Sequence, residues 1–277
     1  MDNLRNIEWI YPHCHNILDE ILFCNNCHYK GIIKDNLFHL YKNGDSWKEC
    51  IKEKAGWISI HKEQNIYINN EDHFFLPDGR PHLAEFYKEA KRAVEKFLEI
   101  ENINDKTLLD IGAGIGWVDC YILQKIPSAK IIAFDCNDDE WVGLGRANKL
   151  KSYHHVDFIS LVGDTHNIPI ADNSIDIVVM VDALHHFVDI SKVFEEAYRV
   201  LKPKGHFYAI NEPYREDNIL DENKFLREVC PDEVRHGINE RRPKRIDYLN
   251  AGKLLKLKII NEEIGFVAPG LILYGEK

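Results

Sequence analysis

A short apolar run that ends at Asp110 is followed by three glycines at alternate positions, Gly112, Gly114 and Gly116. The run predicts a buried strand, and the sequence from Trp117 onward predicts a helix. Glycine lets the backbone adopt a positive φ and approach a ligand closely. In a parallel α/β sheet, the first strand-to-helix turn lies at the carboxyl ends of the strands, where ligands bind. We therefore predict that this turn binds a ligand.

Beyond residue 106, helix-length segments alternate with apolar strand-like runs, which read TLLDIG, KIIAFD, DFISLVGD, IDIVVMV and GHFYAIN. Strands separated by helices imply right-handed crossovers and a parallel sheet covered on both faces. A helix is expected over 190–201, with a turn at 202–205. The tail IGFVAPGLILYGE predicts two last strands joined at Pro269-Gly270. We expect an α/β fold with a doubly wound, seven-stranded, mostly parallel sheet.

Changes in composition and in predicted secondary structure divide the chain into three parts. Residues 1–45 are turn-rich and hold three of the seven cysteines, whereas residues 46–104 contain a Pro/Gly loop and an amphipathic helix. Residues 105–277 form the α/β domain, with a polar and basic insertion at about 214–258.

Composition excludes several classes of protein. The chain has 277 residues, with 35 Lys and Arg against 45 Asp and Glu, so its net charge is −10. A net anion disfavours general binding to nucleic acid or anionic membranes. No apolar run approaches the roughly 18 residues of a membrane span, and no secretory signal is visible. An odd count of seven cysteines favours reduced thiols and a cytoplasmic location.

The glycine spacing separates two classes of cofactor. A dinucleotide fingerprint places its third glycine three positions after the second, whereas Gly116 comes two positions after Gly114. Trp117 also fills a position that a dehydrogenase needs small. Asp110 would sit badly against a pyrophosphate but would attract an ammonium group. These features favour S-adenosylmethionine, a sulfonium zwitterion without phosphate, over a nicotinamide dinucleotide.

The segment 110–116 resembles motif I of class I S-adenosylmethionine-dependent methyltransferases, which have a Rossmann-like fold. The likeness extends over about residues 106–212 and is similar to the ubiquinone/menaquinone-biosynthesis type. It implies that Asp135, at the end of KIIAFD, accepts hydrogen bonds from both ribose hydroxyls. The segment LVGDTHNIP matches the family's "GD…P" pattern, which implies that Asp164 binds the adenine amino group with Thr165 as its backbone helper.

Two later segments extend the resemblance. Residues 182–189, DALHHFVD, are similar to the family's "xLHHxxD", and residues 199–205 follow "RVLKPGG" with Lys204 replacing a glycine. Helices before the first strand close over the substrate in many family members, so we expect a helical lid over about 46–100. The cofactor-binding residues implied by the resemblance are Asp110, Gly112, Gly114, Gly116, Asp135, Asp164, Thr165 and Asp182, the last lining the methionine end or the acceptor pocket.

Methyl transfer is an in-line displacement at a carbon that the sulfonium already activates, so much of the catalysis can come from orientation. A base is needed only if the acceptor must lose a proton, and histidine is the commonest choice. His185 and His186 follow the fourth strand beside the expected methyl group. We predict that one of them acts as a base or orients the acceptor; packing against the cofactor loop is the alternative. Glu212 is a weaker candidate.

The N-terminal part resembles a degenerate zinc ribbon, C-P-x-C…C-x-x-C, in which Tyr11 replaces the first cysteine. Paired knuckles of this kind suit tetrahedral zinc, which makes Cys14, Cys24 and Cys27 candidate ligands. A neighbouring histidine would have to supply the fourth ligand, and a relic ribbon held by packing is the alternative. Similar ribbons precede methyltransferase domains in some bacterial ribosomal-RNA guanine methyltransferases, which keeps an RNA acceptor open.

Residues 235–258 contain eight basic residues and two acidic ones. We favour the interpretation that these residues form a solvated helical face. The alternatives are a binding site for an acidic small molecule and a narrow RNA contact. One concentrated patch suits an anionic small molecule better than a long RNA footprint.

The expected function is therefore methyl transfer from S-adenosylmethionine to a small-molecule acceptor. The alternatives are an rRNA or tRNA base methyltransferase and a catalytically silent cofactor-binding subunit. The sequence does not identify the acceptor, the methylated atom or the oligomeric state.

Overall fold

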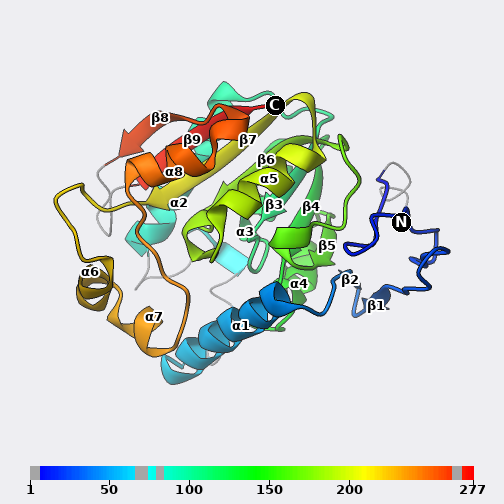
Figure 1. Cartoon of the computed structure of the whole chain (residues 1–277), viewed down its shortest axis with the longest axis horizontal. Coiled ribbons are helices and arrows are strands. Elements are labelled where there is room, and N and C mark those ends of the chain that lie inside the picture. The colour runs from blue at the N-terminus through cyan, green and yellow to red at the C-terminus, as the bar shows by residue number, and fades with distance from the viewer. Residues whose placement is uncertain (1–6, 66–73, 79–83, 264–269) are drawn as a thin grey trace.

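A nine-stranded sheet runs through the centre of this computed structural model, which describes residues 7–65, 74–78, 84–263 and 270–277 (Figure 1). The strand order is β1-β2-β5-β4-β3-β6-β7-β9-β8. The strands are β1 (Ile32–Lys34), β2 (Leu37–His39), β3 (Thr107–Ile111), β4 (Lys130–Asp135), β5 (Ile159–Val162), β6 (Ile175–Val181), β7 (Leu201–Pro213), β8 (Lys258–Glu263) and β9 (Gly270–Glu276). The α-helices are α1 (Asp45–Glu63), α2 (Ala84–Ile100), α3 (Trp117–Lys125), α4 (Ala147–His154), α5 (Ile190–Val200), α6 (Glu222–Val229), α7 (Pro231–Arg235) and α8 (Arg245–Ala251).

Strands β3 to β9 form the predicted seven-stranded, doubly wound sheet. Pairing is parallel from β5 through β4, β3 and β6 to β7, and antiparallel at β9 and β8. Helices α5 and α8 pack on one face, and α2, α3 and α4 on the other. Because both faces are covered, the central strands are apolar on both sides: Leu109 joins one core cluster and Leu108 the other.

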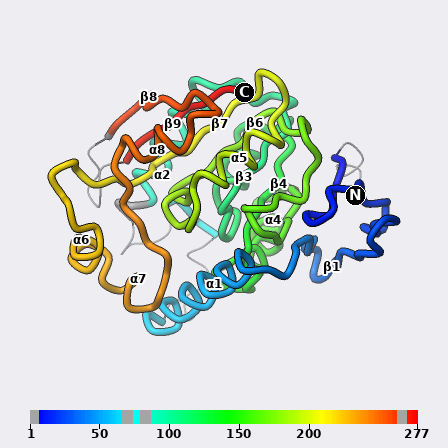
Figure 2. The backbone as a smooth tube through the Cα atoms, viewed as in Figure 1, coloured from blue at the N-terminus to red at the C-terminus, as the bar shows by residue number. Residues whose placement is uncertain are grey.

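The N-terminal segment contributes the remaining two strands. β1 and β2 form a hairpin, and β2 pairs in parallel with β5 through Phe38 and Leu161. The tube view shows the segment at one end of the molecule and α6 and α7 at the other, with α1 running between them (Figure 2). The ribbon-like segment therefore extends the sheet, which the sequence did not indicate.

The sheet ends in antiparallel strands, as predicted, and β8 lies before the predicted tail. The first strand predicted within the tail and its junction at Pro269 fall on 264–269, outside the described residues. β8 was hidden because it is a charged edge strand. Residues 202–205 lie within β7 as a bulge, shown by a shift in its register with β6 between Ile175 and Ile177, and do not form a separate turn.

In the described part of the chain, no helix combines the length and the apolar character needed to cross a bilayer.

Two carboxyl groups lie buried together behind the glycine turn. Asp110 is 2% exposed and Asp119, in the first turn of α3, is 0% exposed. Burial raises the pKa of Asp119 to about 7 and, together with the neighbouring Asp119, raises the pKa of Asp110 well above its usual range. Asp110 Oδ1 and both Asp119 oxygens lack a hydrogen-bond partner of normal geometry among the described residues. A proton held by the pair therefore stabilises the fold.

The substitution Asp119→Asn should stabilise the protein at pH 8 by up to about 4 kcal/mol, because the wild-type pair must ionise there. The folded pKa of Asp119 lies above the unfolded value of about 3.9, so the stabilisation by this proton is complete below pH 4 and is lost as the pH rises through about 7. Urea unfolding at pH 5 and pH 8 measures the effect. The exposed Asp105→Asn serves as the control, and an equal gain at both pH values would contradict the assignment.

Candidate functional site

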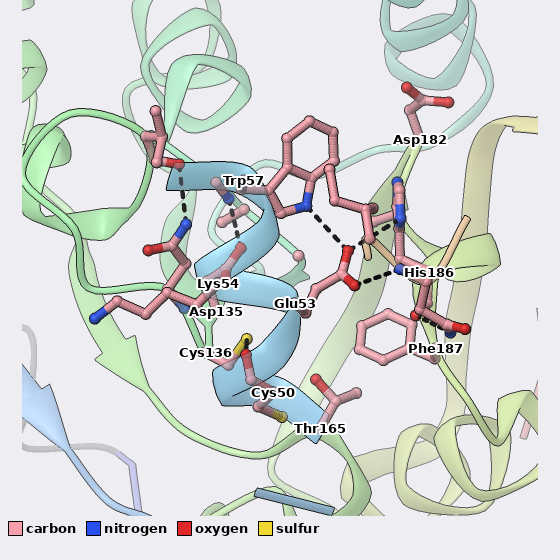
Figure 3. Close-up of a pocket in the computed structure, with 18 of the residues that line it drawn as sticks. Cys50, Glu53, Lys54, Trp57, Asp135, Cys136, Thr165, Asp182, His186 and Phe187 are labelled. Carbon is pink, nitrogen blue, oxygen red and sulfur yellow. Dashed lines mark hydrogen bonds and ion pairs between the residues drawn. The ribbon is translucent and has the colours of Figure 1, made fainter. Parts of the chain in front are cut away.

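A cavity of about 460 Å³ opens at the carboxyl ends of β3, β4 and β6. Its walls come from α1, the glycine turn, the segment after β4, the segment after β6 and residues 237–239. Figure 3 shows α1 crossing this cavity with Cys50, Glu53 and Trp57 directed into it. This is the edge of the sheet at which the sequence placed the ligand.

The glycine turn has the predicted backbone geometry. Gly112 and Gly114 line the cavity with φ of 77° and 55°, and a β-carbon on Gly114 would meet no atom within 4 Å. The backbone at Gly114 is thus open to a ligand. Asp135, at the end of β4, lines the same cavity, and its Oδ2 accepts a hydrogen bond of 2.8 Å from the Gly114 amide. The structure therefore brings the turn and the predicted ribose-binding carboxylate together.

Two of the predicted cofactor residues do not line the cavity. Asp110 faces Asp119 behind the turn, so the direct attraction between its carboxylate and an ammonium group has no support in this geometry. Gly116 begins α3 with φ 78°, and a β-carbon there would lie 2.8 Å from the Phe158 ring. Both residues shape the turn from behind.

Asp164 is also absent from the cavity lining, whereas Thr165 lies in it. The Asp164 carboxylate is 1% exposed and accepts hydrogen bonds from Ser46 Oγ at 2.5 Å, from the His166 amide at 2.9 Å and from Asn167 Nδ2 at 3.1 Å. These hydrogen bonds hold its pKa below the usual range despite burial. Asp164 thus ties the start of α1 to the end of β5, a contact that the sequence gave no means to predict.

Asp182 lies in the cavity wall directly after β6. Its backbone is left-handed, with φ 53°, an uncommon conformation for a residue with a side chain. Burial raises the pKa of its carboxyl group to about 6, and His186 and Arg242 oppose that rise. Near neutral pH, Asp182 is thus an anion in the wall, suited to a cationic group of a ligand.

The two histidines of the predicted pair differ in position. His186 lines the cavity, and its ring lies edge-on to Trp57 with 5.5 Å between ring centroids (Figure 3). His185 is 3% exposed and does not line this cavity; its Nδ1 lies 2.9 Å from Glu212 Oε2. Burial lowers the pKa of His185 well below its usual range. His185 is therefore buried in the wall and does not reach the acceptor space.

Glu212 is fully buried behind the wall rather than facing the crevice. It accepts hydrogen bonds from the backbone amides of Ala183, Leu184 and His185 at 2.9, 2.9 and 3.2 Å. Burial raises its pKa to about 7, against the effect of these amides. Glu212 fixes the loop that carries both histidines.

Helix α1 supplies residues that the sequence did not single out for the site. Glu53 accepts a hydrogen bond of 3.0 Å from the Trp57 indole and one of 2.7 Å from the Asn239 amide. The only sequence signal was the Trp-rich stretch of the expected lid, and it did not indicate which face of α1 points inward.

The basic insertion does not present an open anion-binding patch at its arginines. Arg235 pairs with Glu63 and Asp232, Arg242 with Glu240, and Arg245 with Glu216 and Glu262. Arg241 pairs with Glu222. These arginines brace the insertion against α1 and β8, so half of the eight basic residues of 235–258 are paired with carboxylates.

The three N-terminal cysteines lie together. Cys14 Sγ is 3.5 Å from Cys24 Sγ and 3.4 Å from Cys27 Sγ. The turns 11–14 and 24–27 share one geometry: His15 and His28 are both left-handed, and their amides donate to Tyr11 O and Cys24 O at 2.9 and 2.8 Å. Tyr11 stands where the first cysteine of a ribbon would be, and its ring stacks on Tyr29.

Comparison with known proteins agrees with this geometry. A family model described as a methyltransferase domain matches residues 109–209. Demethylmenaquinone methyltransferase of Thermotoga maritima is 31% identical over 123 residues, which cover 44% of this chain and 49% of that protein. The ubiquinone/menaquinone biosynthesis C-methyltransferase UbiE of Rickettsia prowazekii is 29% identical over 134 residues, 46% of this chain and 52% of that protein. The chain thus spans about half the length of these curated relatives.

A solved structure shows the same fold. Geranyl diphosphate C-methyltransferase from Streptomyces coelicolor, solved with S-adenosyl-L-homocysteine, has a TM-score of 0.59 at 12% identity and covers 84% of this chain and 98% of its own. The family match and the strand order agree on the segment that carries the glycine turn, Asp135 and the His185–His186 pair. Residues 109–209 thus match the methyltransferase domain model, and the chain has the Rossmann-like fold of class I S-adenosylmethionine-dependent methyltransferases.

Proposed function

We propose that this protein transfers the methyl group of S-adenosylmethionine to a small-molecule acceptor. The observation that carries the proposal is the Gly114–Asp135 contact inside the cavity, which presents an open backbone and a carboxylate to one ligand. The relatives whose names include methyltransferase activity on quinones support the same assignment. Seven free cysteines support a cytoplasmic location.

In this proposal, Asp135 binds the ribose diol, Thr165 lies beside the adenine, and Asp182 faces the cationic end of the cofactor or the acceptor. The cofactor supplies a methyl carbon activated by its sulfonium. The protein contributes orientation and removes water, since α1 and residues 237–239 wall the cavity. His186, the pair's cavity-lining member, is the acceptor-orienting residue.

The cavity volume of about 460 Å³ favours a small acceptor. Aromatic side chains of Trp57, Tyr87 and Trp117 line it, which suits a partly apolar molecule. The pairing of the insertion's four arginines with carboxylates weakens the case for an anion-binding site or an RNA contact built on them. A catalytically silent subunit would bind the cofactor but would not transfer its methyl group. An assay for methyl transfer from labelled cofactor to fractionated metabolites distinguishes this alternative from an active enzyme.

Calorimetry should detect S-adenosylmethionine binding with a Kd in the micromolar range, about −8 kcal/mol, and no competition by NADH. Asp135→Ala should weaken binding by at least about tenfold, because charge-assisted hydrogen bonds are each worth roughly 1.5–3 kcal/mol. The exposed Asp157→Asn is the matched control. Binding of NADH without S-adenosylmethionine would overturn the proposal, and unchanged affinity in folded Asp135→Ala would remove the ribose assignment.

The two histidines should respond differently to substitution. With an acceptor identified from labelled-cofactor screening, His186→Asn should lower kcat by about 10²-fold, the size expected for a misplaced acceptor, while cofactor affinity is retained. His185→Asn should lower the free energy of unfolding by about 1–3 kcal/mol, because Glu212 loses a buried partner. Equal kcat in His186→Asn and wild type would exclude His186 from acceptor contact.

We also propose that Cys14, Cys24 and Cys27 bind one zinc ion. Their separations of 3.5 and 3.4 Å are close to the roughly 3.8 Å that tetrahedral Zn–S bonds of about 2.3 Å require. Purified protein should contain about one zinc per chain at this site, and Cys24→Ser should release it, whereas Cys120→Ser in the core should not. Elemental analysis that finds no loss of zinc on Cys24→Ser, or none at all after metal-supplemented expression, identifies the segment as a relic ribbon.

A further inference from the structure

A second group of metal-ligating side chains lies in the wall of the cavity. His185 Nε2 is 3.7 Å from Glu240 Oε1, and His186 Nε2 is 3.7 Å from Glu240 Oε2. The three ligand atoms all lie within 4.8 Å of one another. His185 and Glu240 are more than nine-tenths buried, and His186 lies at the boundary with the cavity.

The opposite nitrogen of each imidazole faces a different carboxylate. His185 Nδ1 is 2.9 Å from Glu212 Oε2, and His186 Nδ1 is 3.3 Å from Glu53 Oε1. His185 Nδ1 is within hydrogen-bond distance of Glu212, whereas His186 Nδ1 makes no hydrogen bond to the residues described. A neutral imidazole has one nitrogen with a lone pair, and this is the form that binds a metal ion. The Nε2 atoms of both histidines face the oxygens of Glu240 at separations too long for a hydrogen bond.

A buried carboxylate beside two imidazoles is unfavourable unless cations or hydrogen-bond donors contact it. Arg242 contacts Glu240 Oε1, the oxygen that also faces His185, and reaches Cys230 Sγ. Glu53, Asp182 and Glu212 are the other carboxylates around the histidines. Carboxylates outnumber the one arginine, and Glu240 Oε2 faces His186 rather than Arg242.

We propose that His185 Nε2, His186 Nε2 and Glu240 bind a divalent transition-metal ion such as zinc. Bonds of about 2.1 Å at tetrahedral angles need ligand atoms roughly 3.4 Å apart, so the three ligand atoms, which lie within 4.8 Å of one another, need side-chain movements toward a common centre. The carboxylates on both Nδ1 atoms are the outer partners that orient metal-bound histidines.

Three protein ligands leave one coordination position for water or for an acceptor oxygen or nitrogen. The site joins four parts of the wall: α1 through Glu53, the loop after β6, Glu212 of β7 and the loop that carries Asn239 and Glu240. The ion therefore holds His186 at the acceptor side of the cavity. This inference stands without the proposed methyl transfer, since it rests on the side chains of the wall alone.

The experiment uses full-length protein carrying Cys24→Ser, which removes the proposed cysteine site. Titration with Zn²⁺ at pH 8, where protons compete less for the histidines, should show one equivalent bound with micromolar or tighter Kd. Co²⁺ should give ligand-field bands without a thiolate charge-transfer band. Glu240→Gln and His185→Asn, each added to this background, should weaken Zn²⁺ binding at least tenfold, and Glu53→Gln should weaken it by about 10–100-fold, the usual effect of losing an outer partner.

His154→Asn, which lies at the end of α4 and away from the cluster, is the matched control and should bind Zn²⁺ as the background does. Absence of Zn²⁺ binding in the folded Cys24→Ser protein overturns the proposal, and so does binding that Glu240→Gln, His185→Asn and Glu53→Gln leave unchanged. Circular dichroism identifies any variant that is not folded. Glu53→Gln keeps all three metal ligands, so it is the substitution expected to disturb the fold least. Cofactor affinity measured on the same samples distinguishes failure of the metal site from failure of the proposed function.

Discussion

The turn between β3 and α3 is the constraint around which the site is built. Gly112, Gly114 and Gly116 all have positive φ, which lets the chain leave the strand and begin a helix within five residues. The Gly114 amide then donates to Asp135 on the adjacent strand, which joins two neighbouring strand ends into one binding surface. A side chain at Gly112 would lie 2.6 Å from Ala183, so the turn also packs against the loop that carries the histidines.

Buried carboxylates organise the rest of the cavity. Asp164 holds α1 through Ser46, Glu212 holds the histidine loop through three backbone amides, and Glu53 holds residues 237–239 through the Asn239 amide. Each carboxylate gains directional partners that offset the cost of burial. The wall is therefore rigid but rich in negative charge, a balance that suits a site for cationic ligands.

The N-terminal segment is integrated with the site rather than appended to it. β2 extends the sheet at β5, and the chain then continues directly into α1, whose first turn bonds Asp164. The cysteine cluster lies at the start of this path. The segment is therefore connected to the cavity wall both along the sheet and through the start of α1.

The alternation of strands and helices after residue 106, the glycine turn and the cavity positions of Asp135, Thr165, Asp182 and His186 were predictable from the sequence, because they depend on local apolar runs and on motifs that follow strand ends. The burial of Asp110 against Asp119, the inward face of α1 and the separation of His185 from the cavity were not predictable, because each depends on which side of a strand end or helix faces a neighbour. The convergence of Glu240, some 54 residues downstream of His186, on the histidine pair likewise follows from the docking of the insertion. Sequence alone determined the seven-stranded part of the sheet and the strand edge at which the cavity opens, since these follow from periodicity and turn chemistry. Only the tertiary structure decided which charges share a buried space, since that depends on long-range packing.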